Sequence, residues 1–453
     1  MGELARSGII EEIQAALEAG RIDEAISLLN RLHPADRADA FEVLDDGEQA
    51  ALLPEMDLAT AADLLEEMEE EEAADVAEGL SSEVLADVLD EMEPDEAADL
   101  LGDLPPQQAS EALAAMEDAD EVIPLLRHAD ETAGGLMTTA FIALRPRTTA
   151  SQAIEFLRRT RPDGGTPYYL YVVDKDSRLV GVVGLRELIL ADPSARIGDI
   201  MNPNVIRVQT DVDQEEAARQ MARHNLAALP VVDANGVMQG VITHDDIIDV
   251  LQDEATEDLL HLGGIESGPI ADKPYWSQRI TEVVRSRFTW LLVLFVAQTL
   301  TGTVLHYFQS ELQAVVELTF FIPLLIGTGG NAGSQTVTAV IRALALKEVR
   351  RRDALRVLHR ELASGALLGL LLAVVALVRV ALWSVPLELA VVVSVTVLFV
   401  CIWANTVGAL VPILADVIGI DPTVMSAPLI STLVDATGLL IYLTVAVLVL
   451  EQI

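Results

Sequence analysis

Hydrophobic positions recur every twelve residues along the first part of the chain. Each unit begins with Leu or Met, carries alanine six positions later in six successive units, and carries a second apolar residue nine positions later. The leading positions are Leu32, Leu44, Met56, Met68, Leu80, Met92, Leu104 and Met116. A fixed period with fixed chemistry indicates a repeat array. We expect a superhelix of short α-helices, each about eight residues long and followed by a tight turn.

An acidic side chain stands seven positions after the leading residue in six of seven units, which predicts a solvated stripe. The segment EMEPDEAADLLGDLP differs, because Asp95 and Asp99 are four residues apart and share one helix face. Like charges at this spacing destabilise a helix slightly unless a cation lies between them. This pair is therefore a candidate cation site.

From about residue 137 the pattern changes to alternating strands and helices. The segments YLYVVDKDSRLVGVVGLREL and LPVVDANGVMQGVITHDDIID each show a β-branched run, a polar turn, a second run and a helix start. This pattern predicts a tandem α/β repeat, which resembles a pair of CBS domains through the stretch Gly240-x-x-Thr243-x-x-Asp246. The resemblance implies that Thr243 and Asp246 hold the ribose of an adenine nucleotide such as ATP. The alternative is that both copies serve only as a dimer interface.

An acidic helix is predicted next, over 245–262. Asp249, Asp253 and Glu257 recur at intervals of four and share one face of this helix, with Asp258 beside them. Such a face either binds a cation or forms without one, in spite of the repulsion between its carboxylates. The stretch HLGGIESGPIADKPYW is rich in helix breakers and ends the helix.

Five apolar stretches are each long enough to span a bilayer, which needs about 20 residues. They lie near 288–308, 314–341, 361–383, 386–413 and 424–450. Arg and Lys residues precede the first stretch and fill the loop after the second, whereas the loop after the first has none. By the positive-inside rule we expect a cytoplasmic N-terminus and a C-terminus outside the cell.

Charge separates the chain into two environments. Its 453 residues include 71 acidic and 29 basic side chains, a formal charge of −42, and most of the acidic ones precede the apolar stretches. An acidic surface repels nucleic acid and attracts cations, although solubility alone is the other reading. The N-terminus lacks the features of a signal peptide, so we expect this part to stay in the cytoplasm. The single cysteine, Cys401, excludes an internal disulfide and a thiolate metal site.

One carboxylate stands near the middle of a predicted span. Asp435 has no Lys or Arg at comparable depth, apart from Arg379 near the outer end of another stretch. Intramembrane carboxylates are costly and functional by default, the alternative being a protonated side chain in a helix contact. Carboxylate and amide oxygens suit hard cations such as Mg²⁺ or Ca²⁺. Asp435 is therefore the candidate cation ligand of the membrane part.

The order of these parts resembles the MgtE-type family of magnesium channels and transporters. The motifs that carry the resemblance are PLLIGTGGNAGSQ at 323–335 and GIDPTVMSAPLISTLVDATG at 419–438. The resemblance implies a homodimeric, Mg²⁺-selective channel of the cell membrane that closes when intracellular Mg²⁺ is high.

The same resemblance assigns roles to individual residues. It implies that Asp435 is the pore carboxylate, with Asn331 and Asn405 as neighbours, and that Glu361 and Asp421 lie at the cytoplasmic mouth. The implied sensor ligands are Asp95, Asp99, Asp249 and Glu257, and the further candidate metal ligands are Asp253 and Asp258.

We therefore expect a multidomain protein. Its predicted parts are an all-α superhelical N domain over 1–133, an α/β CBS pair over 134–250, a connecting helix and linker over 251–280, and an α-helical transmembrane domain with five spans over 281–453. Two other functions remain open: a secondary transporter of divalent cations coupled to H⁺ or Na⁺, and a membrane-tethered nucleotide sensor. An enzyme is not expected, because Ser334 has no His at matching depth and the chain has no His-Glu-x-x-His motif.

Overall fold

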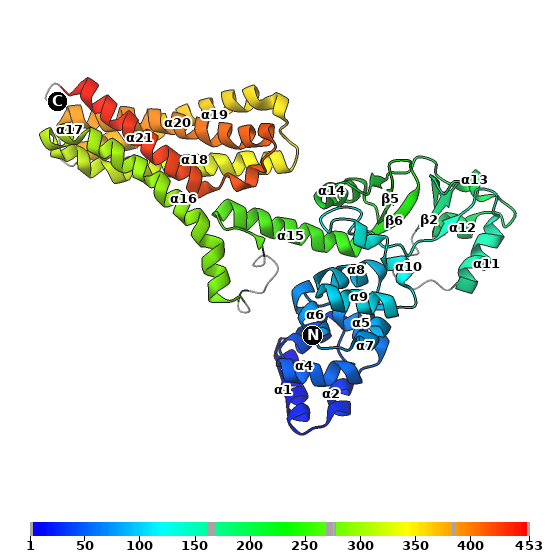
Figure 1. Cartoon of the computed structure of the whole chain (residues 1–453). Coiled ribbons are helices and arrows are strands. Elements are labelled where there is room, and N and C mark those ends of the chain that lie inside the picture. The colour runs from blue at the N-terminus through cyan, green and yellow to red at the C-terminus, as the bar shows by residue number, and fades with distance from the viewer. Residues whose placement is uncertain (1–2, 161–168, 269–274, 276–277, 383–385, 451–453) are drawn as a thin grey trace. The chain divides into compact units, whose positions relative to one another are not determined.

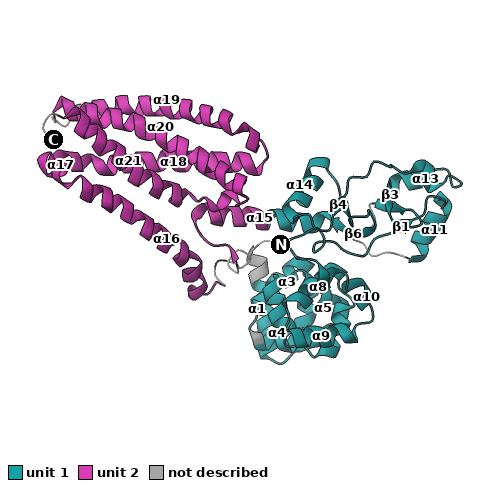
Figure 2. Ribbon diagram, turned by 45° about the horizontal axis from the view of Figure 1, so that its top comes forward, with its two compact units in different colours: residues 1–252 teal, residues 253–453 magenta. Residues whose placement is uncertain are grey.

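The computed structural model describes residues 3–160, 169–268, 275, 278–382 and 386–450 (Figure 1). The chain divides into two compact units, residues 1–252 and residues 253–453 (Figure 2). We call them unit 1 and unit 2, and each has its own hydrophobic core.

Unit 1 begins with the predicted array of short helices. After α1 (Glu3–Glu18), eight helices start at intervals of twelve residues, so the helical repeat is confirmed. They are α2 (Ile22–Leu29), α3 (Pro34–Glu42), α4 (Asp46–Leu52), α5 (Leu58–Glu66), α6 (Glu70–Ala77), α7 (Ser82–Leu89), α8 (Pro94–Asp103) and α9 (Pro106–Ala115). The short α10 (Ala119–Val122) follows.

Burial and helix capping explain most of the repeated positions. The leading Leu and Met residues lie in the turns after the helices and are only 4–8% exposed. Proline or a capping side chain begins most of the helices, as at Pro94 of α8 and at Ser81, which accepts the N–H of Val84 before α7. Five of the six repeated alanines are buried and Ala50 is exposed. The acidic stripe is solvated at Asp39, Asp63, Asp75, Asp87 and Glu111.

The second part of unit 1 contains two similar three-stranded sheets. The first has the order β1-β2-β3 and the second the order β4-β5-β6, and in each the first pair is parallel and the second antiparallel. The strands are β1 (Ala143–Leu144), β2 (Tyr169–Val173), β3 (Leu179–Gly184), β4 (Val208–Gln209), β5 (Ala228–Val232) and β6 (Met238–Thr243). The accompanying helices are α11 (Ala150–Thr160), α12 (Leu185–Leu190), α13 (Ile197–Ile200) and α14 (Gln214–His224). The predicted tandem α/β repeat is therefore present.

The helix α15 (His244–Gly263) follows β6 without a break, close to the predicted bounds. Its last residues belong to unit 2, where Leu262 packs against a core cluster that includes Val337 and Ile430. Gly264 ends the helix at a φ of +72°, and a Cβ there would lie 2.4 Å from the Trp290 ring. Glycine is therefore required at this turn for both its backbone conformation and its size.

Unit 2 is a bundle of long helices. They are α16 (Ile280–Tyr307), α18 (Ile322–Ala345), α19 (Ala354–Ala381), α20 (Leu387–Ile418) and α21 (Ala427–Val449), with α17 (Gln309–Ala314) between the first two. The helices α18, α20 and α21 pack against one another, α19 packs on α20, and α16 packs on α21. Glycines at these contacts, such as Gly333 and Gly369, let the helix backbones approach closely.

Four helices of the described chain are long and apolar enough to cross a membrane: α16, α19 with the turn before it, α20 and α21. The second predicted span, 314–341, instead comprises the end of α17, a 3₁₀ segment (Val316–Phe321) and most of α18. The α18 helix carries Asn331, Gln335 and several Ser, Thr and Gly residues, which lower its apolar character. The count of five spans therefore stays a prediction.

Candidate metal sites

Asp435 is the ninth residue of α21, whose start is fixed by neighbouring elements. Ser426 caps the helix by accepting the N–H of Leu429, and its Oγ atom also accepts the indole N–H of Trp290 at 2.9 Å. The Oδ1 atom of Asp435 is buried and has no hydrogen-bond partner among the described residues. The carboxylate therefore has an unused acceptor inside the membrane bundle.

The backbone of α18 lies directly against this carboxylate. A Cβ on Gly330 would lie 3.3 Å from Oδ1 of Asp435 and 2.5 Å from Oγ of Ser431, so a larger residue would force the Ser431 hydroxyl to move. Asn331 follows Gly330 and is exposed within the single chain. The GTGGNAGSQ motif thus brings Gly330 next to Asp435 and leaves the amide of Asn331 accessible.

Two other predicted membrane residues contact each other. The Nδ2 atom of Asn405 on α20 lies 3.5 Å from Oε2 of Glu361 on α19. Asn405 is buried and Glu361 is half-buried. The amide of Asn405 thus faces α19.

A third group lies where the end of α15 meets the segment before α21. Burial and the nearby Asp421 carboxylate both raise the pKa of Asp258. Glu257 accepts the hydroxyl of Ser267 at 3.0 Å, and His261 lies 3.4 Å from Oγ1 of Thr423. Asp421 itself is exposed, and its Oδ1 atom accepts the N–H of Thr423.

The fourth group is a cluster of acids in unit 1, formed by α8 and the first turn of α15. Asp95 is 5% exposed, and its Oδ1 atom has no partner among the described residues. Burial raises its pKa well above the ordinary value, and the Asp246 carboxylate raises it further. The hydroxyl of Thr138 is a hydrogen-bond partner of the Asp95 carboxylate and offsets only part of this effect.

The same cluster contains an acid that the sequence reading missed. Burial, followed by the charges of Asp95 and Asp99, raises the pKa of Glu96 to about 9. Burial and the Glu70 charge raise the pKa of Asp99 to about 7. Glu96 stands in the same PDEAAD segment as the other two, and the charge of Asp246, far away in the sequence, raises its pKa further. We call Asp95, Glu96, Asp99 and Asp246 the acid cluster.

The remaining predicted ligands lie elsewhere on α15. Asp249 and Asp253 are exposed, and burial of part of the Asp249 side chain raises its pKa, with Asp245 as the second cause. Within the described residues, no three His, Cys, Asp or Glu side chains are grouped closely enough to hold a metal ion by themselves.

Thr243 and Asp246, the two residues predicted to bind a nucleotide, are hydrogen-bonded to each other. Asp246 accepts the Thr243 hydroxyl at 2.7 Å and the Thr243 N–H at 3.1 Å.

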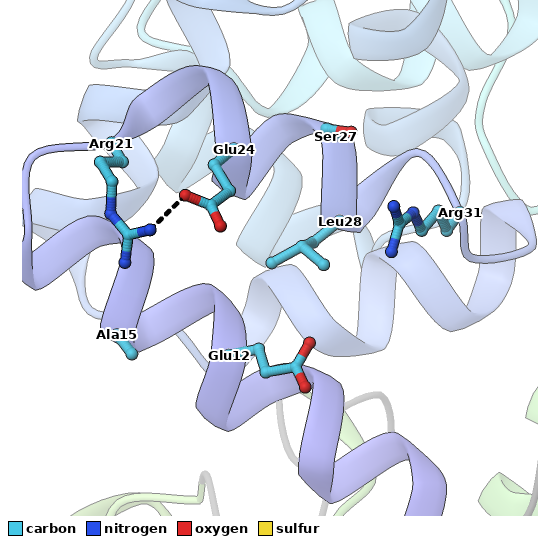
Figure 3. A pocket seen from close by; sticks show the side chains of 7 residues that line it. All are labelled: Glu12, Ala15, Arg21, Glu24, Ser27, Leu28 and Arg31. Carbon is cyan, nitrogen blue, oxygen red and sulfur yellow. Dashed lines mark hydrogen bonds and ion pairs between the residues drawn. The ribbon is translucent and has the colours of Figure 1, made fainter.

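A pocket of about 350 Å³ between α1 and α2 contains none of the predicted ligands (Figure 3). Its lining includes the ion pair of Arg21 and Glu24, together with exposed side chains such as Arg31.

Comparison with known proteins covers all these parts of the chain. The family model MgtE, a divalent cation transporter, matches residues 322–445, the model of the MgtE intracellular N domain matches residues 32–131, and the CBS domain model matches residues 133–194 and 197–253.

Named relatives match over most of their length. A magnesium transporter MgtE of Thermus thermophilus is 45% identical over 333 residues, which are 74% of this chain and 73% of the relative. A magnesium transporter MgtE of Enterococcus faecalis is 35% identical over 330 residues, 73% of this chain and 72% of the relative. The crystal structure of the cytosolic domain of the Mg²⁺ channel MgtE in complex with ATP matches 53% of this chain and 99% of its own, with a TM-score of 0.51 and 37% identity. The chain belongs to the MgtE family of divalent cation transporters.

Proposed function

We propose that this protein conducts Mg²⁺ across the cell membrane and that intracellular Mg²⁺ closes it. The observation that carries the proposal is the unpartnered carboxylate of Asp435 beside Gly330, in a chain whose relatives are named magnesium transporters. Mg²⁺ dehydrates reluctantly and is commonly held through water by one or two carboxylates. Asp435, with the accessible amide of Asn331, offers such ligands.

The protein is proposed to act as a homodimer with the pore on its two-fold axis. Two copies of Asp435 would then face one hydrated divalent ion, and the ion would offset the cost of charge within the membrane. The N-terminus lies in the cytoplasm in this arrangement, since Arg350, Arg351 and Arg352 belong to the basic loop after α18. Asp421, beside Asp258 of α15, would lie at the cytoplasmic mouth.

Closure is proposed to follow from the acidic side chains of unit 1 and α15. When no cation is bound, the ionised members of the acid cluster repel one another, as do Asp249, Asp253, Glu257 and Asp258, and the members of the cluster with raised pKa values bind protons instead. Mg²⁺ between these carboxylates would favour the compact state, and α15 would then hold the membrane helices closed. Such a ligand shifts a two-state equilibrium by its preference for one state.

Nucleotide binding is a second proposal for unit 1. The relative crystallised with ATP matches this part of the chain, and Thr243 and Asp246 lie at the end of β6 and the start of α15, where a ribose could replace their mutual hydrogen bond. Because Asp246 also belongs to the acid cluster, ATP would alter the affinity for Mg²⁺.

The acid cluster predicts a stability that falls as the pH rises when divalent ions are removed. The pKa of Glu96 is raised to about 9 and that of Asp99 to about 7, so the folded state binds more protons than the unfolded state above the ordinary carboxyl range. The stabilisation is complete below the ordinary pKa of these groups and is lost as the pH rises through their folded values. The melting temperature of the full chain in chelator should therefore fall between pH 5 and pH 9, roughly.

Two comparisons test this explanation. Glu96→Gln should flatten the pH dependence, whereas Glu83→Gln, at an exposed position of α7, should leave it unchanged. Added Mg²⁺ should raise the melting temperature most at high pH. A melting temperature that is independent of pH in chelator would contradict the assignment.

The proposed transport activity is tested by ion flux in liposomes containing the full chain, with Mg²⁺, Ca²⁺, Mn²⁺ and Co²⁺ compared. We expect Mg²⁺ flux that decreases as Mg²⁺ rises on the side of unit 1. Single-channel currents distinguish a channel from a coupled transporter. Absence of flux with every one of these ions, in protein that is folded and inserted, would leave the anchored nucleotide sensor as the explanation.

A further inference from the structure

Three exposed arginines at the start of α19 have no opposite charge beside them. Arg352 lies in the 3₁₀ turn before the helix, and Arg356 and Arg360 follow at intervals of four residues. Within the part of the chain that the structure describes, no ion pair or hydrogen bond engages their guanidinium groups. Arginine keeps its charge at any physiological pH, so these side chains form a permanent positive surface.

The acidic side chains nearby already have partners. The contacts join Glu348 to Arg342 at 3.7 Å, Asp353 to the N–H of Arg350 at 3.2 Å, Asp416 to Arg351 at 2.9 Å, and Glu361 to the amide of Asn405 at 3.5 Å. The unpaired arginines are notable in a chain that has 71 acidic and only 29 basic side chains. Their opposite charge would therefore come from outside this loop and helix.

The arginines continue the apolar face of α19 that other helices leave uncovered. At about 100° per residue, Arg356 and Arg360 lie on the same side of the helix as three apolar residues further along. These are Leu367, Val374 and Val378, and each is more than half exposed. The helix packs on α20, and Figures 1 and 2 show it at the edge of the bundle. In a membrane this face meets lipid.

The length of the apolar run brings the arginines to the depth of lipid headgroups. Residues 362–378 contain no charged side chain and belong to a helix that is long and apolar enough to cross a membrane. Seventeen helical residues extend about 25 Å, which is close to the hydrocarbon thickness of about 30 Å. Arg360 stands just before this run, where phosphates replace acyl chains. A guanidinium group binds a phosphate through two parallel hydrogen bonds.

We propose that Arg352, Arg356 and Arg360 bind the headgroup of an anionic phospholipid, whose acyl chains lie along the exposed apolar face of α19. A zwitterionic lipid carries the same phosphate, but its own ammonium group balances the charge. An anionic lipid supplies the negative charge that the three arginines lack. The adjoining apolar face favours a lipid over a soluble phosphate or an acidic protein surface, because only a lipid would occupy both parts.

This surface is independent of the proposed Mg²⁺ conduction, because none of its residues belongs to the candidate metal sites. Native mass spectrometry of the full chain in detergent tests it with phosphatidylglycerol and phosphatidylcholine of identical acyl chains. We expect the first phosphatidylglycerol to bind more tightly than phosphatidylcholine, with an advantage that decreases as the salt concentration rises. Combining Arg352→Gln, Arg356→Gln and Arg360→Gln should weaken phosphatidylglycerol binding roughly tenfold or more and leave phosphatidylcholine binding nearly unchanged.

The matched control has the same change in charge at exposed positions of unit 1, namely Arg158→Gln, Arg159→Gln and Arg186→Gln. It should bind phosphatidylglycerol as the wild type does. Both variants should keep the wild-type melting temperature, since every altered side chain is exposed.

Four results would overturn the proposal. Equal affinity of the wild type for the two lipids would leave an acidic protein surface as the partner of the arginines. An unchanged preference in the α19 variant would mean that phosphatidylglycerol binds elsewhere. An equal loss in the α19 variant and the control would attribute the preference to net charge. Displacement of phosphatidylglycerol by the same concentration of glycerol phosphate would identify a soluble phosphate as the ligand.

Discussion

Replacing Asp435 with alanine should abolish Mg²⁺ flux while the protein still folds and assembles. The carboxylate has an unpartnered oxygen inside the bundle and no ion pair in the described structure, so its removal takes away the proposed ligand without breaking a salt bridge. The expected loss is to background in a liposome flux assay with a Mg²⁺-sensitive dye. Size-exclusion chromatography and the melting temperature should match those of the wild type.

The matched control is Thr444→Val on the same helix. Thr444 is exposed, and its hydroxyl donates to the carbonyl of Leu440 at 2.7 Å, so the substitution changes a polar group of α21 away from the α18 contact. Its flux should equal that of the wild type. Wild-type flux in Asp435→Ala would disprove the pore assignment.

Neutralising the proposed sensor should leave the protein open at high Mg²⁺. The variant replaces Asp95, Asp99 and Asp249 with asparagine and Glu257 with glutamine, which removes carboxylates of the acid cluster and of α15. Because repulsion then no longer depends on bound Mg²⁺, the ion loses its preference for the compact state. Flux at a Mg²⁺ concentration that closes the wild type should approach the fully open value, and Mg²⁺ should no longer protect unit 1 from protease.

A second variant with the same change in charge separates specific ligands from general acidity. Asp23, Asp75 and Asp87 become asparagine and Glu83 becomes glutamine, all at exposed positions of the helical repeat. This chain should close as the wild type does, because exposed charges interact weakly and are screened by salt. If both variants stayed open, net charge rather than the named residues would control closure. If both closed normally, the sensor assignment would be wrong.

The sequence predicted the repeat and the CBS pair well because both depend on local pattern. A leading Leu or Met every twelve residues was enough to expect the short helices, and the paired β-branched runs were enough to expect β2 with β3 and β5 with β6. The number of membrane spans was harder to predict from the sequence. The α18 helix combines Pro323, Asn331 and Gln335 with apolar residues, and a hydropathy pattern cannot tell a polar membrane helix from a segment outside the membrane.

The side-chain contacts at the candidate sites could not be predicted from the sequence, because they join elements that are far apart along the chain. Burial is the largest cause of the raised pKa of Glu96, followed by the charges of Asp95 and Asp99 in the same segment, and a further cause is the charge of Asp246 on α15, which stands far away in the sequence. Asp258 beside Asp421, and Trp290 with Ser426, are likewise tertiary contacts. Helical periodicity places a residue on a face and does not state which other element meets that face.

Because α15 is an unbroken helix, insertions within it would change which of its side chains share a face. Its twenty residues contain no proline, and glycine occurs only at the last position, so the face of Asp249 and the face of Glu257 keep a fixed rotation about one axis. One residue inserted between Asp249 and Glu257 would turn Glu257 by about 100° about the helix axis, whereas four inserted residues would return it to nearly the same face of the helix. A substitution in α15 therefore changes one carboxylate at a time, whereas a change of its length between these residues moves several carboxylates off their shared face at once.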